Sequence, residues 1–405
     1  MTHSSLARLV LCAGLLAFTT LALTVPAFTF FGAQATVETG SAPPPEGRPP
    51  TGALTRTQSR RWEITLSLDL PELRRRETVE EALIVPVSVL DTWWRVDPRS
   101  FRTRVSVDFV PVPPTQFTIT VAPSRFGESR VEIPIPNVIE QRLTAELAWT
   151  VEVWSCALDE ARASKIAWPA AWPDEVQRFR SASAGINSQD PLIQGALREI
   201  SSRLPEQLAP LYAAKEIIRA GSRILRNADH SEGGMAGSKS RGVVVWGATQ
   251  ALSSHIGGEA DVTCICLALL RAAGFPARPV IGLAHDRSRR NNASNADKLS
   301  LWGEVFLPEC GWVPFDAAQI RGGISAQTPV TQQWNGFGTD RDFDERVPIT
   351  HELDLYTPKA SDIGRTASFA ALCRLKTKLE QPGQGPTDIL IQTSVVSRGR
   401  GDGGP

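Results

Sequence analysis

Two kinds of hydrophobic periodicity divide this chain, and the division constrains its fold more than any other feature. Between residues 62 and 154, apolar and polar residues alternate in short segments that Pro, Asp and Gly separate. A period of two is typical of strands with one buried face, and this spacing is typical of a β-sandwich. The segments are Trp62–Leu68, Ala82–Val89, Arg104–Val110, Gln116–Val121, Arg130–Ile135 and Thr144–Trp154. We therefore predict an immunoglobulin-like β-sandwich over residues 62–160.

The second half of the chain has helical spacing instead. Asp190 and Pro191 suit the N-cap and first position of a helix whose apolar residues recur on one face. A second amphipathic segment covers about 208–225, and a strongly apolar one runs from Glu259 to Ala273. Alternating segments follow at Ala277–Leu283, Leu301–Phe306 and Trp312–Phe315. Helices followed by antiparallel strands predict an α+β domain, which we place at residues 185–356.

The N-terminal segment predicts export. Arg8 precedes an apolar run from Leu9 to Phe31, and Ala33-Gln34-Ala35 suits cleavage by signal peptidase. Residues 1–35 are thus predicted to be a signal peptide or, because the run could cross a bilayer, an uncleaved single-span anchor. Either form implies a protein that is periplasmic or anchored facing the periplasm. Pro-rich residues 36–61 predict a linker, and 357–405 a C-terminal extension whose last residues, from Ser397, are disordered.

Composition excludes several classes of partner. The 43 basic residues equal the 43 acidic ones, and no basic stripe carries interleaved aromatic residues, so no nucleic-acid partner is expected. Six cysteines in 405 residues are too sparse for a disulfide scaffold, although a bond from the apolar helix to Cys310 stays open. The spacing of Cys and His matches no zinc motif, so we expect neither a metal nor a cofactor.

Three ordered blocks carry a resemblance to a known family. They are Leu269–Gly282 (LLRAAGFPARPVIG), Trp302–Phe306 (WGEVF) and Gly311–Asp316 (GWVPFD). Together they resemble the core of the transglutaminase-like superfamily over about residues 185–320. The resemblance implies a papain-type α+β fold, often preceded by a sandwich in bacterial members. It also implies a triad of a cysteine at the start of the buried helix, a histidine on the next strand and an aspartate on the one after.

The chain departs from that triad at two of its three positions. The cysteine position falls on Glu259, the histidine position falls on Ser300, and only Asp316 keeps the residue type of the family. Cys264 lies about 140° round the helix from Glu259, and Cys266 lies about 10 Å further along its axis, so neither replaces the missing nucleophile. Both are expected to be inert, buried side chains.

The predicted site therefore consists of these three positions and a pocket around them. Asp261, Trp302 and Glu304 are predicted to line that pocket. In one interpretation Glu259 only caps its helix and bonds Ser300. In a second, the protein is a pseudoenzyme, a binding or scaffold module at the cell envelope for a peptide, amine or protein ligand. The alternative is a hydrolase or acyltransferase that uses Glu259, Ser300 and Asp316, which needs one carboxylic acid with a raised pKa.

Overall fold

The computed structural model describes residues 37–39, 52–70, 82–89, 91–113, 119–123, 129–134, 142–205, 207–225, 227–228, 242–284, 298–339, 345–356, 368–370, 372–376, 388–390 and 393–400. From Val37 onward these residues belong to one unit. The predicted export segment, residues 1–35, lies outside them. No helix within the described ranges is long and apolar enough to cross a membrane.

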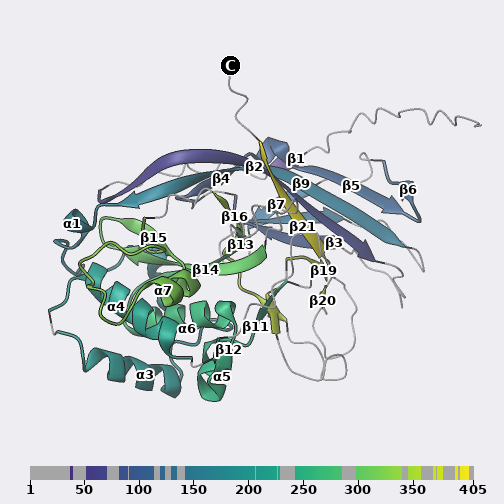
Figure 1. Ribbon diagram of the computed structural model, residues 1–405. Helices are drawn as coiled ribbons and strands as arrows, with labels where there is room; N and C mark the ends of the chain where they lie inside the picture. The colour runs from purple at the N-terminus through teal and green to yellow at the C-terminus, as the bar shows by residue number, and fades with distance from the viewer. Residues whose placement is uncertain are drawn as a thin grey trace, which may run out of the picture. The chain divides into compact units, whose positions relative to one another are not determined.

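Strands from both ends of the chain build two six-stranded sheets (Figure 1). One sheet has the order β21-β2-β9-β5-β6 with β4 also paired to β9, and the other has the order β1-β7-β8-β3-β19-β20. The bounds are β1 Val37–Thr39, β2 Leu54–Leu70, β3 Ala82–Val87, β4 Trp94–Val96, β5 Arg102–Val107, β6 Val110–Pro111, β7 Ile119–Pro123, β8 Ser129–Pro134, β9 Leu143–Leu158, β19 Arg374–Lys376, β20 Asp388–Leu390 and β21 Thr393–Arg400. Apart from the parallel β1–β7 pair, the strands in these sheets pair antiparallel.

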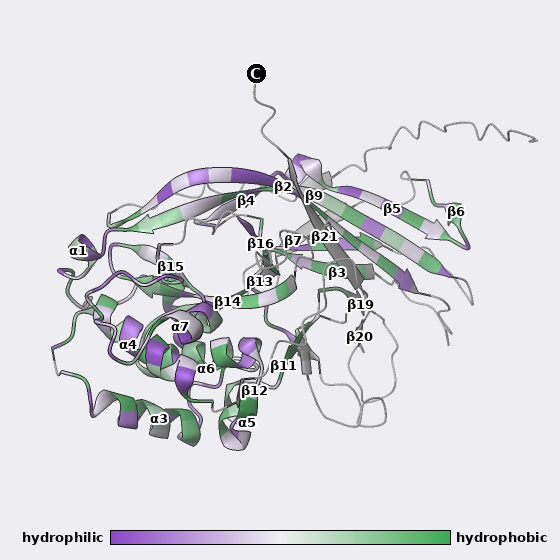
Figure 2. Ribbon diagram, in the orientation of Figure 1, coloured by the Kyte–Doolittle hydropathy of each residue, from purple (hydrophilic) through white to green (hydrophobic). Residues whose placement is uncertain are grey.

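The predicted alternation is visible in these strands. Along β9 buried residues alternate with partly exposed ones from Leu143 to Trp154, so one face of the sheet is buried and the other faces outward. Figure 2 shows the same alternation of hydrophobic and hydrophilic residues along β5 and β9. Antiparallel strands in this part are confirmed, whereas their immunoglobulin-like arrangement stays a prediction.

Two ranges differ from the sequence-based expectation. Strand β2 begins at Leu54, within the range predicted as linker, because residues 55–61 are mostly exposed and carry no apolar alternation. Residues 397–400, expected to be disordered, form the end of β21 and pair with residues 61–64 of β2. Backbone pairing in a ladder needs no apolar side chains, so composition misses such segments.

The helical part surrounds one buried helix, α6 (Glu259–Ala272), which is buried from Ala260 to Arg271. It packs against four helices and against the four-stranded sheet β15-β14-β13-β16. The helices are α3 Pro191–Ser201, α4 Pro210–Arg223, α5 Ala248–Ser254 and α7 Ala317–Gly323, and the strands are β13 Ala277–Ala284, β14 Lys298–Leu307, β15 Gly311–Phe315 and β16 Arg346–Thr350. Short elements complete this part: α1 Glu160–Ala163, α2 Asp174–Gln177, β10 Asn227–Ala228, β11 Val243–Val245, β12 Ile256–Gly257, β17 Leu355–Tyr356 and β18 Ser368–Ala370.

Local signals at the ends of these helices have the expected roles. The Asp190 carboxylate accepts a hydrogen bond from the Leu192 backbone at 2.9 Å and caps α3. Gly274 follows the C-cap of α6 with a φ of +90°, a backbone conformation that favours glycine.

A Cβ at Gly303 would lie 2.2 Å from the Phe315 ring, so only glycine lets β14 and β15 approach as they do.

Candidate functional site

The first turn of α6 is fastened by Asp261. Its carboxylate accepts hydrogen bonds from the backbone of Gly258 at 2.9 Å, Trp246 at 2.8 Å and Gly247 at 2.9 Å. Burial raises the pKa of Asp261 in spite of these three donors. The structure therefore gives Asp261, predicted to line the pocket, a positioning role, because it holds the preceding loop against the helix that begins at Glu259. Glu259 itself is half-buried.

Strand β14 carries three more of the predicted site residues at alternate positions. Ser300 pairs with Gly282 of β13, Trp302 with Val280 and Glu304 with Arg278. Since side chains alternate along a strand, these residues of β14 share one face. The Thr263 hydroxyl of α6 lies 3.3 Å from the Leu301 carbonyl, so the start of α6 packs against β14 beside Ser300 and Trp302.

Asp316 is the N-cap of α7 and is ion-paired. One carboxylate oxygen accepts a hydrogen bond from the Gln319 backbone at 3.0 Å, and the other accepts from the Arg346 guanidinium of β16. Arg346 in turn lies 5.6 Å from the centre of the Trp302 ring. Burial by itself would raise the pKa of Asp316, but Arg346 and the backbone donors more than offset it, and the pKa is below its ordinary value. Asp316 is therefore an ionised carboxylate whose partner is an arginine.

The thiols near this site are buried inside the helix. Cys264 and Cys266 are each 0% exposed, and burial raises the pKa of both well above that of a free thiol. All five cysteines in the described part of the chain are free, so the bond from the helix to Cys310 is not formed. Cys264 and Cys266 therefore stay protonated at neutral pH.

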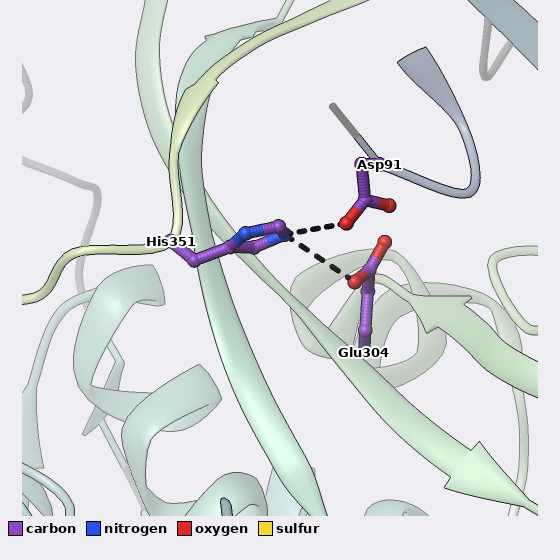
Figure 3. Close-up of side chains that lie close together, drawn as sticks. All are labelled: Asp91, Glu304 and His351. Atoms are coloured by element: carbon purple, nitrogen blue, oxygen red, sulfur yellow. Dashed lines mark ion pairs between the residues drawn. The ribbon is translucent and has the colours of Figure 1, made fainter. Parts of the chain in front are cut away.

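A second group of charged side chains joins the loop between β3 and β4 to strands β13 and β14 (Figure 3). The Arg278 guanidinium is 2.5 Å from the Asp91 carboxylate and 2.6 Å from the Glu304 carboxylate. His351, just after β16, points its Nε2 at the same two oxygens, at 3.6 Å from Asp91 and 3.5 Å from Glu304. All four side chains are buried. Glu304 thus belongs to this ionic cluster, whereas the sequence predicted it for the pocket.

Polar and aromatic neighbours hold the cluster in place. The Ser88 hydroxyl contacts Nδ1 of His351 at 3.4 Å and accepts from the His351 backbone at 3.1 Å. The Trp94 ring lies 4.8 Å from the His351 ring, and the Trp312 ring lies 4.0 Å from the Arg278 guanidinium. The ionic cluster therefore joins the β-sheets of the N-terminal part to the α+β part through packed, hydrogen-bonded contacts.

The ionic cluster has the side-chain types of a metal site, but the Arg278 guanidinium already supplies a cation there. Single ligand atoms of Asp91, Glu304 and His351 lie within 4.8 Å of one another. Arg278 hydrogen-bonds the carboxylate oxygens that face His351, which is where a metal ion would bind. Burial alone would raise the pKa of Glu304, but Arg278 and His351 bring it below its ordinary value. This is the arrangement of a buried ion network.

Sequence reasoning missed Asp91, Arg278 and His351 as a group. The signal that could have found two of the partners is the pair Arg278 and Glu304, which stand in the first two motif blocks and are paired across neighbouring strands. Nothing in the local sequence around Asp91 or His351 marks them as their partners.

A comparison with solved structures supports the fold. This mixed α and β fold is similar to that of one candidate cysteine protease. A candidate cysteine protease from Cytophaga hutchinsonii of known crystal structure superposes with a TM-score of 0.51 at 14% identity, over 86% of this chain and 93% of that one. A candidate protease from Parabacteroides distasonis gives a TM-score of 0.19 at 8% identity, over 82% of this chain and 68% of that one.

A family model matches part of the chain in sequence. Residues 208–317 match the family model of the transglutaminase-like superfamily, which confirms the resemblance of the three motif blocks. No curated protein matches the chain significantly in sequence.

Proposed function

We propose that this chain is an exported transglutaminase-like protein that lacks Cys-dependent catalysis and acts as a binding or scaffold module at the cell envelope. The observation that carries the proposal is the pair of residues at the reactive positions of the family pattern. Glu259 stands at the cysteine position, and Ser300 stands at the histidine position. A carboxylate and a hydroxyl supply neither the thiolate nor the imidazole that attack on an acyl group requires.

The surroundings of Asp316 support the same proposal. In a papain-like triad the aspartate orients the imidazole, whereas here the Asp316 carboxylate pairs with Arg346 and caps α7. The nearest thiols in the sequence, Cys264 and Cys266, are fully buried. Each component of the thiol mechanism is therefore replaced or inaccessible.

The alternative, a hydrolase or acyltransferase that uses carboxylates, has less support. A pair of carboxyl groups needs one member that is protonated near neutral pH to act as a general acid. The pKa of Asp316 lies below its ordinary value because Arg346 stabilises the ionised form. Asp316 would thus have to act as the base, and Glu259 or Ser300 would have to supply the proton.

The ligand that fits a half-buried carboxylate at a helix start is a group with N–H donors. Glu259 could accept hydrogen bonds from an amine or from a peptide backbone, so we propose a peptide, amine or protein ligand. We further propose that the N-terminal sheets form an immunoglobulin-like sandwich and that the mature chain begins near Thr36 or stays anchored through Leu9–Phe31. Mass determination of the N-terminus and cell fractionation test the last point, and an intact chain in the soluble cytosolic fraction would contradict it.

The main experiment measures thiol-dependent transfer. We expect no incorporation of dansylcadaverine into casein and no peptide cleavage, with an active cysteine-dependent transglutaminase as the positive control. Iodoacetamide should label the folded chain slowly, because its described thiols are buried. Thiol-dependent activity of the unaltered chain would contradict the proposal.

A rebuilt triad provides the matched test. The double variant Glu259→Cys, Ser300→His restores the family residues, and Arg346→Gln frees the Asp316 carboxylate to orient the new imidazole. We expect the thiolate reactivity of the introduced cysteine at neutral pH to rise from Glu259→Cys alone to the triple variant. Equal reactivity of the single and triple variants would show that these three positions do not converge.

A further inference from the structure

Four arginines surround a cavity on the outer face of the sheet β21-β2-β9-β5-β6, far along the sequence from Glu259, Ser300 and Asp316. The cavity has a volume of about 460 Å³, within the usual size range of small-molecule sites. Its lining includes Arg61 of β2, Arg95 of β4, Arg102 of β5 and Arg99 in the crossover between β4 and β5. All four side chains are exposed, so a solute can reach them.

The ladder of strands explains why these charges converge. Glu152 of β9 pairs in register with Arg61 on one side and with Arg95 on the other. The crossover that carries Arg99 is fastened to β9, because the Thr150 backbone donates to the Ser100 hydroxyl at 2.7 Å and the Thr150 carbonyl accepts from the Asp97 backbone at 3.1 Å. The arginines thus project from a framework of paired backbone.

The positive charge in the cavity is only partly neutralised. The two acidic residues of the lining are already engaged: Glu152 contacts Arg95 at 3.4 Å and Ser59 at 3.1 Å, and Asp97 accepts from the Arg99 backbone at 3.0 Å. Within the described residues, the guanidinium groups of Arg61, Arg99 and Arg102 have no ion pair or hydrogen bond. Four positive and two negative side chains leave an excess of two positive charges. Like charges held close together repel one another, and a bound anion relieves that repulsion.

We propose that this cavity binds a small anion that carries one or more phosphate groups. Guanidinium groups match phosphate oxygens in bidentate geometry, and a phosphate monoester carries about 1.5 to 2 negative charges at neutral pH, which equals the excess charge of the lining. The phosphate could belong to a soluble compound or to the headgroup of a lipid. The proposal rests on residues of the N-terminal sheet and is independent of the chemistry at Glu259.

Titration calorimetry of the full chain with inorganic pyrophosphate tests the site. We expect saturable binding that weakens as salt is added, because salt screens exposed charges. Arg102→Gln and Arg99→Gln should each weaken the binding about tenfold, the effect of one lost charge-assisted contact. Arg104→Gln is the matched control: it lies on the same strand and on the same face but outside the cavity, and should change the affinity by less than about twofold.

Cosedimentation with phosphatidylcholine vesicles, with and without phosphatidic acid, whose headgroup is a phosphate monoester, distinguishes the two sources. Binding to the anionic vesicles that Arg102→Gln weakens and pyrophosphate displaces assigns the phosphate to a lipid headgroup. Pyrophosphate binding without vesicle binding assigns it to a soluble compound. Two results would overturn the proposal: no binding of either probe, or an equal loss of affinity in Arg104→Gln and Arg102→Gln, which would indicate a diffuse field of positive charge.

Discussion

Strand β14 carries both Ser300, one of the predicted triad positions, and Glu304 of the ionic cluster, and the two residues differ in their surroundings. Ser300 and Glu304 lie four residues apart on one face of this strand. Glu259 and Ser300, which our proposal assigns to the cysteine and histidine positions of the family, are half-buried. Around Glu304, Arg278 pairs with two carboxylates in a fully buried setting. The comparison teaches that the residues that join the N-terminal sheets to the α+β part are different from those that our proposal assigns to the family triad.

The largest effect should come from Arg278→Met. Removal of the guanidinium leaves Asp91 and Glu304 as like charges in a buried place, so we expect a loss of about 3–5 kcal/mol in the free energy of unfolding, measured by urea denaturation. Arg203→Gln is the control, because Arg203 and its partner Glu199 are 73% and 71% exposed, and it should cost less than about 0.5 kcal/mol. A loss below about 1 kcal/mol for Arg278→Met would mean that the ionic cluster does not stabilise the fold.

The next effect concerns the start of α6. Asp261→Ala leaves three backbone donors near the helix start without their acceptor, and we expect a loss of about 2–3 kcal/mol in the free energy of unfolding. Asp261→Asn should cost less, because its amide oxygen can replace Oδ1, which accepts from both Trp246 and Gly247. If the two variants unfold at the same urea concentration, the carboxylate does not act through these hydrogen bonds.

A smaller effect, with a distinct pH dependence, is expected at Asp316. Asparagine keeps the cap on α7 but loses the ion pair, so Asp316→Asn should cost about 1–2 kcal/mol at pH 7. Because the pKa of Asp316 in the folded state lies below its ordinary value of 3.8, the ion pair stabilises the fold above that pH and the stabilisation is lost as pH falls through the folded pKa.

Urea unfolding of the wild type and of Asp316→Asn should therefore converge as pH falls below 3.8 and through the folded-state pKa. The pKa of Glu304 in the folded state is likewise below its ordinary value of 4.5. Both proteins should therefore still lose stability as pH falls into the acid range. A difference between the two proteins that does not shrink as Asp316 of the wild type becomes protonated in acid would contradict this assignment.

The smallest effect should come from Glu259→Gln. The carboxylate at the first position of α6 interacts with the helix dipole, which is worth about 0.3–1 kcal/mol. We therefore expect a shift of the thermal midpoint much smaller than that of Arg278→Met. A loss as large as that of Arg278→Met would make Glu259 a structural residue and would remove the contrast between the two regions.

The sequence by itself determined the local structure. Alternation predicted antiparallel strands, the apolar run after Glu259 predicted a buried helix, and Asp190 with Pro191 predicted the start of α3, as the structure has them. These features depend on side chains within a few residues of one another, so periodicity and capping chemistry suffice to find them. The prediction of a site at Glu259, Ser300 and Asp316 likewise rests on counting along the motif blocks alone.

Only the tertiary structure decided which distant groups meet. Asp91 and Arg278 are 187 positions apart, and Ser88 and His351 are 263 apart. Contacts between distant segments also pair Asp316 with Arg346, place β21 beside β2 and bring four arginines to one cavity. A charged side chain has the same local sequence signal whether it is solvated or buried beside a partner, because the free energy of the contact depends on burial and geometry that the packed sheets create.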